Sequence, residues 1–132
     1  MSERQVIRVR DVMKPEFDIV DGMMTVSQAL HRMKHVDTKC LIVDKRHQDD
    51  EYGIVLISDI AKQVLAKDRA PDRVNVYEVM SKPAVGVHPD MDIRYCARLL
   101  HMLGFSYTPV IEGERVLGIV GYADLVLNGL AK

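Results

Sequence analysis

The 132-residue chain contains nearly the same stretch twice, and this repetition restricts its fold more than any other feature. GIVLISDI occupies residues 53–60, and GIVGYADL occupies residues 118–125. Likewise, VRDVMKP at 9–15 returns as VYEVMSKP at 76–83. Because self-similarity at a regular interval marks copies of one structural unit, the sequence predicts two related repeats.

A third pair of matching stretches lies between these two anchors and sets the repeat boundaries. TVSQALHRMKHV at 25–36 corresponds to DIRYCARLLHML at 92–103. We therefore place the first repeat with its N-terminal segment at 1–67, a Pro-containing linker at 68–75 and the second repeat at 76–132. The whole chain falls within the usual length of one domain.

Each repeat has a recognisable order of secondary structure. Apolar residues recur at helical spacing after Thr25 and after Asp92, and Thr25 forms a capping-box pattern with Gln28. Two short β-branched runs follow in each copy, separated by a polar turn, which is typical of a hairpin. Short helices at 58–67 and 122–127 complete the predicted order β-α-β-β-α.

The predicted fold class is α/β (α+β), with two pseudo-symmetric β-α-β-β-α repeats packed as a pair. One repeat alone would bury only a marginal core, so the two copies are expected to close a common interface. A three-residue excess in the first copy falls within 45–52, which predicts a hairpin tip there. Pseudo-symmetry also predicts two related ligand sites in the inter-repeat cleft.

Charge and composition exclude several classes of function. With 18 Lys and Arg against 19 Asp and Glu, the net charge of −1 argues against nucleic-acid binding. The N-terminal stretch lacks the apolar core of a signal peptide, and no apolar run could span a membrane, so a cytoplasmic location is expected. Cys40 and Cys96 are isolated, which favours buried thiols over a disulfide or a metal site.

In order, these motifs resemble a tandem pair of CBS (cystathionine-β-synthase-type) domains, called a Bateman module. The resemblance covers nearly the whole chain and depends on DVM and EVM, TVSQAL, TPVIE and the repeated GIVxxxD. It implies a CBS-domain pair that binds an adenosine-type ligand such as AMP, ADP, ATP or S-adenosylmethionine and has no obligatory cofactor. It also implies a homodimer that regulates an unknown partner protein.

The resemblance implies roles for particular residues. Asp59 and Asp124, which close the two GIVxxxD motifs, would hold the ribose hydroxyls, and a carboxylate can indeed accept both hydrogens of a diol. The family also has a Ser or Thr three residues after each glycine, but this chain has Leu56 and Gly121 there. Because Ser58 still offers a hydroxyl and the start of a helix, we expect the Asp59 site to be the better one for a phosphorylated ligand.

An adenine ring also needs apolar walls, with a few polar groups to orient it. Val20 and Val85 would supply such walls, together with Ile42 and Val110. By resemblance, Thr108 and Pro109 would line the same site, although a proline in a strand has a sufficient structural explanation.

Plainer interpretations remain open for the charged candidates. Lys14 and Lys82 hold matching KP positions and would add positive charge to a site, but solvated loop lysines are the more common case. Asp59 and Asp124 each fall where a strand meets a helix, and an acidic residue is favoured there simply as a cap. Ser58 is itself a preferred N-cap residue.

The remaining polar residues suggest no chemistry. His88, like His47 and His101, has no arranged partner in the sequence, and exposure at the hairpin tip explains the acidic cluster 49–51. No nucleophile–base pair or phosphate-binding glycine loop is present, so we expect no enzyme and no metal site. The alternative function is a dimerisation or docking module with degenerate nucleotide sites.

Overall fold

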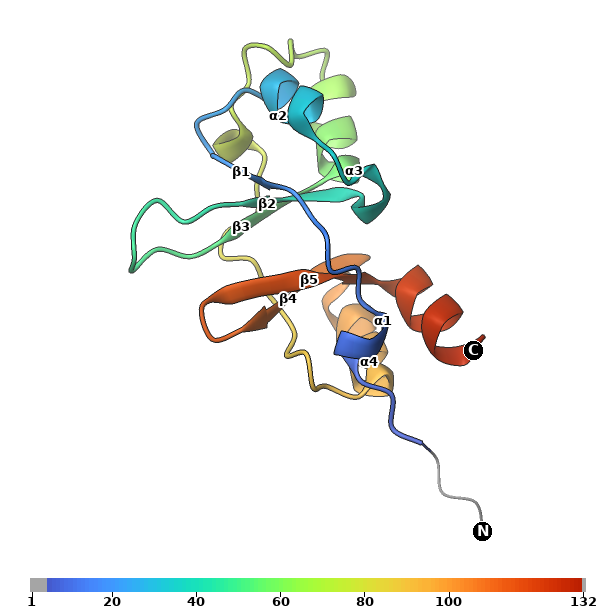
Figure 1. Ribbon diagram of the computed structural model, residues 1–132. Helices are drawn as coiled ribbons and strands as arrows, with labels where there is room; N and C mark the ends of the chain where they lie inside the picture. The colour runs from blue at the N-terminus through green and yellow to red at the C-terminus, as the bar shows by residue number, and fades with distance from the viewer. Residues whose placement is uncertain (1–4, 132) are drawn as a thin grey trace. The chain divides into compact units, whose positions relative to one another are not determined.

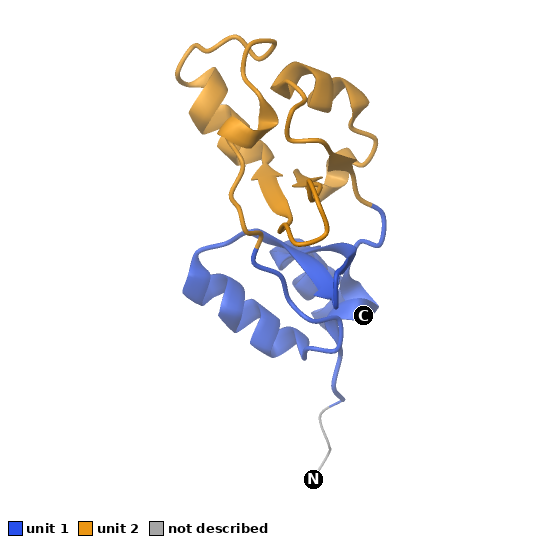
Figure 2. Ribbon diagram, turned by 90° about the vertical axis from the view of Figure 1, so that its left-hand side faces the viewer, with its two compact units in different colours: residues 1–16, 85–132 blue, residues 17–84 orange. Residues whose placement is uncertain are grey.

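The computed structural model describes residues 5–131, so the outermost ends of the predicted repeats and the first four residues of the N-terminal stretch lie outside it. The chain folds into two compact units (Figure 2). Unit 2 is the continuous segment Phe17–Ala84, and unit 1 combines Met1–Glu16 with Val85–Lys132. None of the helices within the described part is long and apolar enough to cross a lipid bilayer.

Unit 2 is built on a three-stranded sheet in the order β1-β2-β3. Strands β1 and β2 are parallel, with Val20 opposite Val43, whereas β2 and β3 form an antiparallel hairpin with Ile42 opposite Ile54. The elements of unit 2 are β1 (Ile19–Val20), α2 (Val26–Arg32), η1 (Val36–Thr38), β2 (Cys40–Val43), β3 (Gly53–Leu56), α3 (Ile57–Ile60), η2 (Ala61–Leu65) and η3 (Val76–Glu78).

The core of unit 2 lies between the sheet and the helices that follow β1 and β3 (Figure 1). Thr25 and Gln28 form the expected capping box, because each side chain accepts the other residue's backbone N–H. The apolar face that begins at Val26 packs on Leu41 and Val55 of the sheet. The expected order β-α-β-β-α is therefore present in this unit.

Unit 1 contains an antiparallel pair of strands and one long helix. Its elements are α1 (Val9–Val12), α4 (Ile93–Leu103), β4 (Tyr107–Glu112), β5 (Arg115–Gly121) and η4 (Asp124–Leu130). Asp92 caps α4 by accepting the backbone N–H of Arg94, as the sequence predicts. Apolar side chains of α1, α4, η4 and the two strands form the core.

The first strand expected in the second repeat is reduced to one bridge in unit 1. Val87 pairs with Val110 in parallel fashion, but no strand forms around it. Pro89 has no backbone N–H to donate, and its carbonyl instead accepts the N–H of Arg10. Here the predicted β-α-β-β-α order is incomplete for a local chemical reason.

The compact units exchange the opening segments of the two sequence repeats. The opening of the first repeat pairs within unit 1, where Lys14 bridges Ile119 of β5. The opening of the second repeat pairs within unit 2, where Ser81 bridges Ile54 of β3. The repeat boundaries at 67 and 76 remain a prediction about the sequence copies, whereas each compact unit takes its opening strand-like segment from the other copy.

Candidate functional site

Asp124, one of the two predicted ribose residues, has its carboxylate enclosed by groups of its own unit. One carboxylate oxygen accepts the backbone N–H of Gly121 at 2.9 Å. The other forms an ion pair with the Nζ atom of Lys14. Both oxygens therefore have a partner within unit 1, and little of Asp124 meets solvent, since the residue is only 4% exposed.

Asp59, the equivalent residue of the first repeat, is less enclosed. Its Oδ2 atom accepts the backbone N–H of Leu56 at 2.9 Å, which repeats the bond between Gly121 and Asp124. Among residues 5–131, no lysine or arginine forms an ion pair with Asp59. The side chain is half-buried, and its second oxygen remains available.

The difference between the two aspartates begins with an inserted serine. Lys14 bridges Ile119, and Ser81 bridges Ile54 at the corresponding place five residues before Asp59. Ser81 is thus the structural counterpart of Lys14. The predicted match between Lys14 and Lys82 holds for the KP letters but is wrong for the positions along the strands.

Lys82 is turned to a different partner by this one-residue shift. Its ammonium group donates to Asp50 Oδ2 at 2.8 Å, and this hydrogen bond is the main cause that lowers the pKa of the Asp50 carboxyl below its ordinary value. The Asp50 side chain is 10% exposed, so the interpretation of that acidic residue as simply solvent-exposed is wrong. The side chains of Lys14 and Lys82 are 26% and 22% exposed, so neither is a solvated loop charge.

Ser58 does not have the N-cap position that its residue type suggested. The helix begins one residue earlier, at Ile57, and Leu56 is the N-cap. A carboxylate three positions beyond the N-cap can accept a hydrogen bond from the backbone N–H of the N-cap residue. Asp59 accepts the N–H of Leu56 in this way. Ser58 lies in the first turn of the helix, past the N-cap, and is exposed.

The other predicted wall residues differ in exposure. Thr108 is 2% exposed and donates its hydroxyl to the carbonyl of Val85, and Pro109 is buried beside it in β4. Val85 is 46% exposed. Val20 is 5% exposed and packs in the core of unit 2, so it presents little surface to any ligand.

Unit 2 also contains a cavity of about 410 Å³ that the sequence interpretation missed. Asp21 and Asp44 line it, and each directly follows a strand of the parallel pair β1 and β2. The carboxyl ends of parallel strands meet at one sheet edge, so the repeated letters IVD at 19–21 and 42–44 were the available signal. The remaining lining residues are Gly22, Met23, Val43, Arg46, Asp50, Tyr77, Met80 and Lys82.

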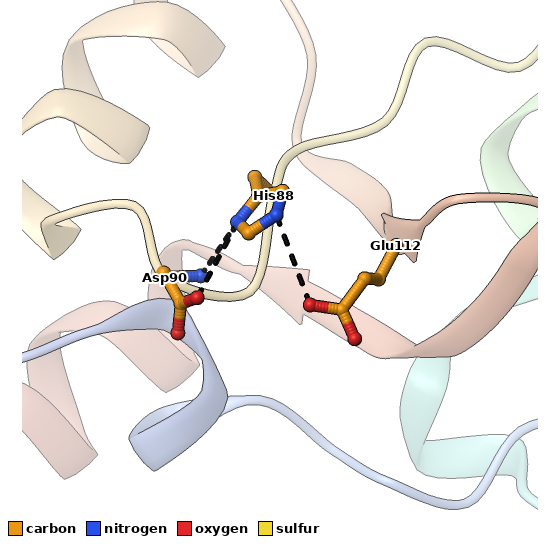
Figure 3. Close-up of side chains that lie close together, drawn as sticks. All are labelled: His88, Asp90 and Glu112. Carbon is orange, nitrogen blue, oxygen red and sulfur yellow. Dashed lines mark hydrogen bonds and ion pairs between the residues drawn. The ribbon is translucent and has the colours of Figure 1, made fainter.

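His88 has partners, contrary to the sequence interpretation. Figure 3 shows its ring between Asp90 and Glu112, with ring nitrogens 3.9 and 3.8 Å from the two carboxylates. Arg10 also pairs with Asp90 at 2.8 Å and is the main cause that lowers the pKa of that carboxyl. The three side chains are exposed, and the arrangement is an ion-pair group on the surface of unit 1.

Comparison with known sequences identifies the repeats. The family model for the CBS domain matches residues 9–66 and again 76–129. The CBS domain-containing protein YhcV of Bacillus subtilis is 26% identical over 123 residues, which cover 93% of this chain and 86% of that protein. An uncharacterized protein of Methanopyrus kandleri, MK0525, is 26% identical over 83% of this chain. The chain spans 57% of that protein and 59% of a second curated relative.

Solved structures show the same fold. The hexameric CBS-CP12 protein from bloom-forming cyanobacteria is 36% identical, with a TM-score of 0.87, over 92% of this chain and 70% of that one. The CBS domain pair of protein MJ0100, solved in complex with 5-methylthioadenosine and S-adenosyl-L-methionine, has a TM-score of 0.79 at 23% identity, over 97% of this chain and 100% of that one. At 23% identity, the similarity to the MJ0100 domain pair concerns the fold alone. With two matches to the family model and these structural relatives, the chain belongs to the CBS domain family and carries a tandem pair of α+β CBS repeats.

Proposed function

We propose that this protein is a regulatory module that binds an adenosine-containing ligand and communicates its occupancy to a partner protein. Membership of the CBS domain family supports a ligand-binding role, and the CBS domain pair of MJ0100 binds adenosine compounds. Regulation by such a module requires that the ligand bind two states of the module with different affinities. No catalytic step is assigned to it.

The observation that carries this proposal is the available carboxylate oxygen of Asp59. A ribose presents two neighbouring hydroxyl groups, and a carboxylate accepts hydrogen bonds but donates none, so the two are complementary. Asp59 retains one oxygen for this purpose after it caps the backbone of Leu56. Ser58, the preceding residue, is exposed, and its hydroxyl would contact the ligand as well.

The proposed ligand is AMP, ADP, ATP or S-adenosylmethionine. An anionic phosphate close to Asp59 would be repelled, so the phosphates of a nucleotide must point away from that carboxylate. Val20 remains a predicted lining residue in unit 2, and Thr108, Pro109 and Val85 remain predicted lining residues in unit 1. Thr108 and Val20 would act through packing, since their side chains are almost wholly buried.

Calorimetric titration with these four compounds tests the proposal. We expect one of them to bind with saturation, and Asp59→Asn to weaken its binding by about 10- to 100-fold, because hydrogen bonds to a charged group contribute about 1.5–3 kcal/mol. Asp37→Asn is the matched control, since Asp37 is an exposed residue of η1 in the same unit. If no compound binds the folded protein, or if Asp59→Asn binds as the wild type does, the proposal is refuted.

A second candidate function is a module that only dimerises or docks to another protein. Exposed apolar side chains on unit 1 favour such an association. Helix α4 exposes Met102, and η4 exposes Leu127 and Leu130, with 75, 61 and 77% of each residue accessible. Exposed apolar side chains mark an interface when they form one contiguous patch. We propose a homodimer, which sedimentation analysis would detect.

The cytoplasmic location predicted from the sequence also remains a proposal, and cell fractionation tests it.

A further inference from the structure

The backbone of Lys14 is fixed against β5. Its N–H donates to the carbonyl of Ile119 at 2.8 Å, and its carbonyl accepts the N–H of Ile119 at 2.9 Å. The neighbouring Gly118 makes this close approach possible, because a Cβ atom there would lie 2.4 Å from the Lys14 carbonyl oxygen. These contacts involve main-chain atoms only, so they leave the identity of the side chain at position 14 free.

The Lys14 side chain completes the surroundings of Asp124. The Gly121 N–H already occupies Oδ2, and the ammonium group of Lys14 takes Oδ1. A ribose diol would need at least one of these oxygens as an acceptor. A carboxylate oxygen can accept two hydrogen bonds, but Asp124 is only 4% exposed, so a ribose hydroxyl could reach Oδ1 only by taking the place of the Lys14 ammonium group. In this arrangement the ammonium group of Lys14 takes the place of a ligand's donor hydroxyl.

Ser81 takes the corresponding backbone position in unit 2, and its short side chain makes no ion pair with Asp59. The lysine of that segment, Lys82, is held by Asp50 instead. Each aspartate therefore accepts the backbone N–H of the residue three positions before it, and the two hold equivalent places in their repeats. They differ in burial and in the presence of one cation.

We infer that Lys14 is the residue that closes the second of two equivalent sites, so that the module takes one adenosine ligand, at Asp59, rather than two. This inference extends the proposed function and depends on it. Lys14 acts here as an internal occupant of the Asp124 site. The serine at position 81 is what leaves the first site open.

Calorimetric stoichiometry of reciprocal variants tests the inference. We expect one ligand per wild-type chain, two per Lys14→Ser chain, and a loss of at least tenfold in affinity for Ser81→Lys. The double variant Lys14→Ser/Asp124→Asn should return to one ligand, which identifies the new site. Thermal unfolding checks that each variant is folded, and Lys14→Gln, which keeps much of the side-chain length without the charge, replaces Lys14→Ser if that variant unfolds.

A second measurement needs no ligand. Acylation of lysines, followed by mass spectrometry, should modify Lys14 at least tenfold more slowly than the exposed Lys67, and Asp124→Asn should abolish this protection. If wild-type Lys14 reacts as fast as Lys67, the closure is refuted. If the wild type binds one ligand and Lys14→Ser gains none, the inference fails while the proposed function stands. If neither binds any adenosine compound, the proposed function fails and the inference fails with it.

Discussion

The repeated glycines at 53 and 118 provide a matched test of how the opening segments pack. At Gly118 an added methyl group would lie 2.4 Å from a backbone oxygen of Lys14, which two hydrogen bonds hold in place. At Gly53 the nearest atom is the Sδ atom of Met80, 2.9 Å away at the flexible end of a side chain. The same substitution should therefore have unequal consequences at the two sites.

The expected magnitude follows from these contacts. Overpacking costs about 1–3 kcal/mol, and Gly118→Ala should reach the upper end of that range because neither backbone can move without loss of hydrogen bonds. Each lost bond adds roughly 1 kcal/mol. A gain of about 0.4–1 kcal/mol from the stiffer unfolded chain offsets part of this cost. We expect a net loss of about 3 kcal/mol for Gly118→Ala and less than about 1 kcal/mol for Gly53→Ala.

Urea denaturation followed by circular dichroism would measure both variants. A shift of the midpoint without a change in slope reports a change in stability alone. Equal losses at the two glycines would refute the reasoning, because a fixed carbonyl should resist the added methyl group more than a movable thioether does. Removal of the thioether contact in Gly53→Ala/Met80→Ala offers a further check of that difference.

Two other predictions concern acid stability and thiol reactivity. A side-chain hydrogen bond from Arg94 lowers the pKa of Asp92 to about 2, so the stability that this carboxylate provides is present above about pH 4 and is lost as the pH falls toward 2. Asp92→Asn should flatten that part of a pH–stability curve, and an unchanged curve would contradict the assignment. Burial raises the pKa of the Cys96 thiol to about 11, and Cys40 is buried too. A thiol reagent at pH 8 should therefore label neither residue in the native protein and both in urea. Rapid labelling without denaturant would count against this packing.

The fold was largely accessible from the sequence because the repeat supplies two independent views of each element. The caps at Thr25 and Asp92 and the hairpin tip near 45–52 are confirmed. The sequence pattern predicts a strand near Val87 that does not form, because a proline two residues later stops the pairing in only one of the two copies. Exchange of the opening segments was also invisible, since matching letters do not show which copy a segment pairs with.

The site was less predictable than the fold. A residue-by-residue match aligned Lys14 with Lys82, but strand pairing aligns Lys14 with Ser81 because one inserted residue reverses the direction of the next side chain. Asp50, the partner of Lys82, lies in a loop, where no strand or helix pattern in the sequence predicts which residues meet. Asp21 and Asp44 were missed because their proximity depends on which two strands lie side by side.

The exchange of opening segments sets the order in which the two compact units can fold during translation. Unit 2 is one uninterrupted stretch, so its backbone is complete once residue 84 has been synthesised. Unit 1 joins a segment that precedes unit 2 to a segment that follows it, and the ion pair of Lys14 with Asp124 connects residues 110 positions apart. During translation the apolar side chains of Val9 and Val12 therefore stay without their unit 1 partners until residues as far along as Leu125 have been synthesised.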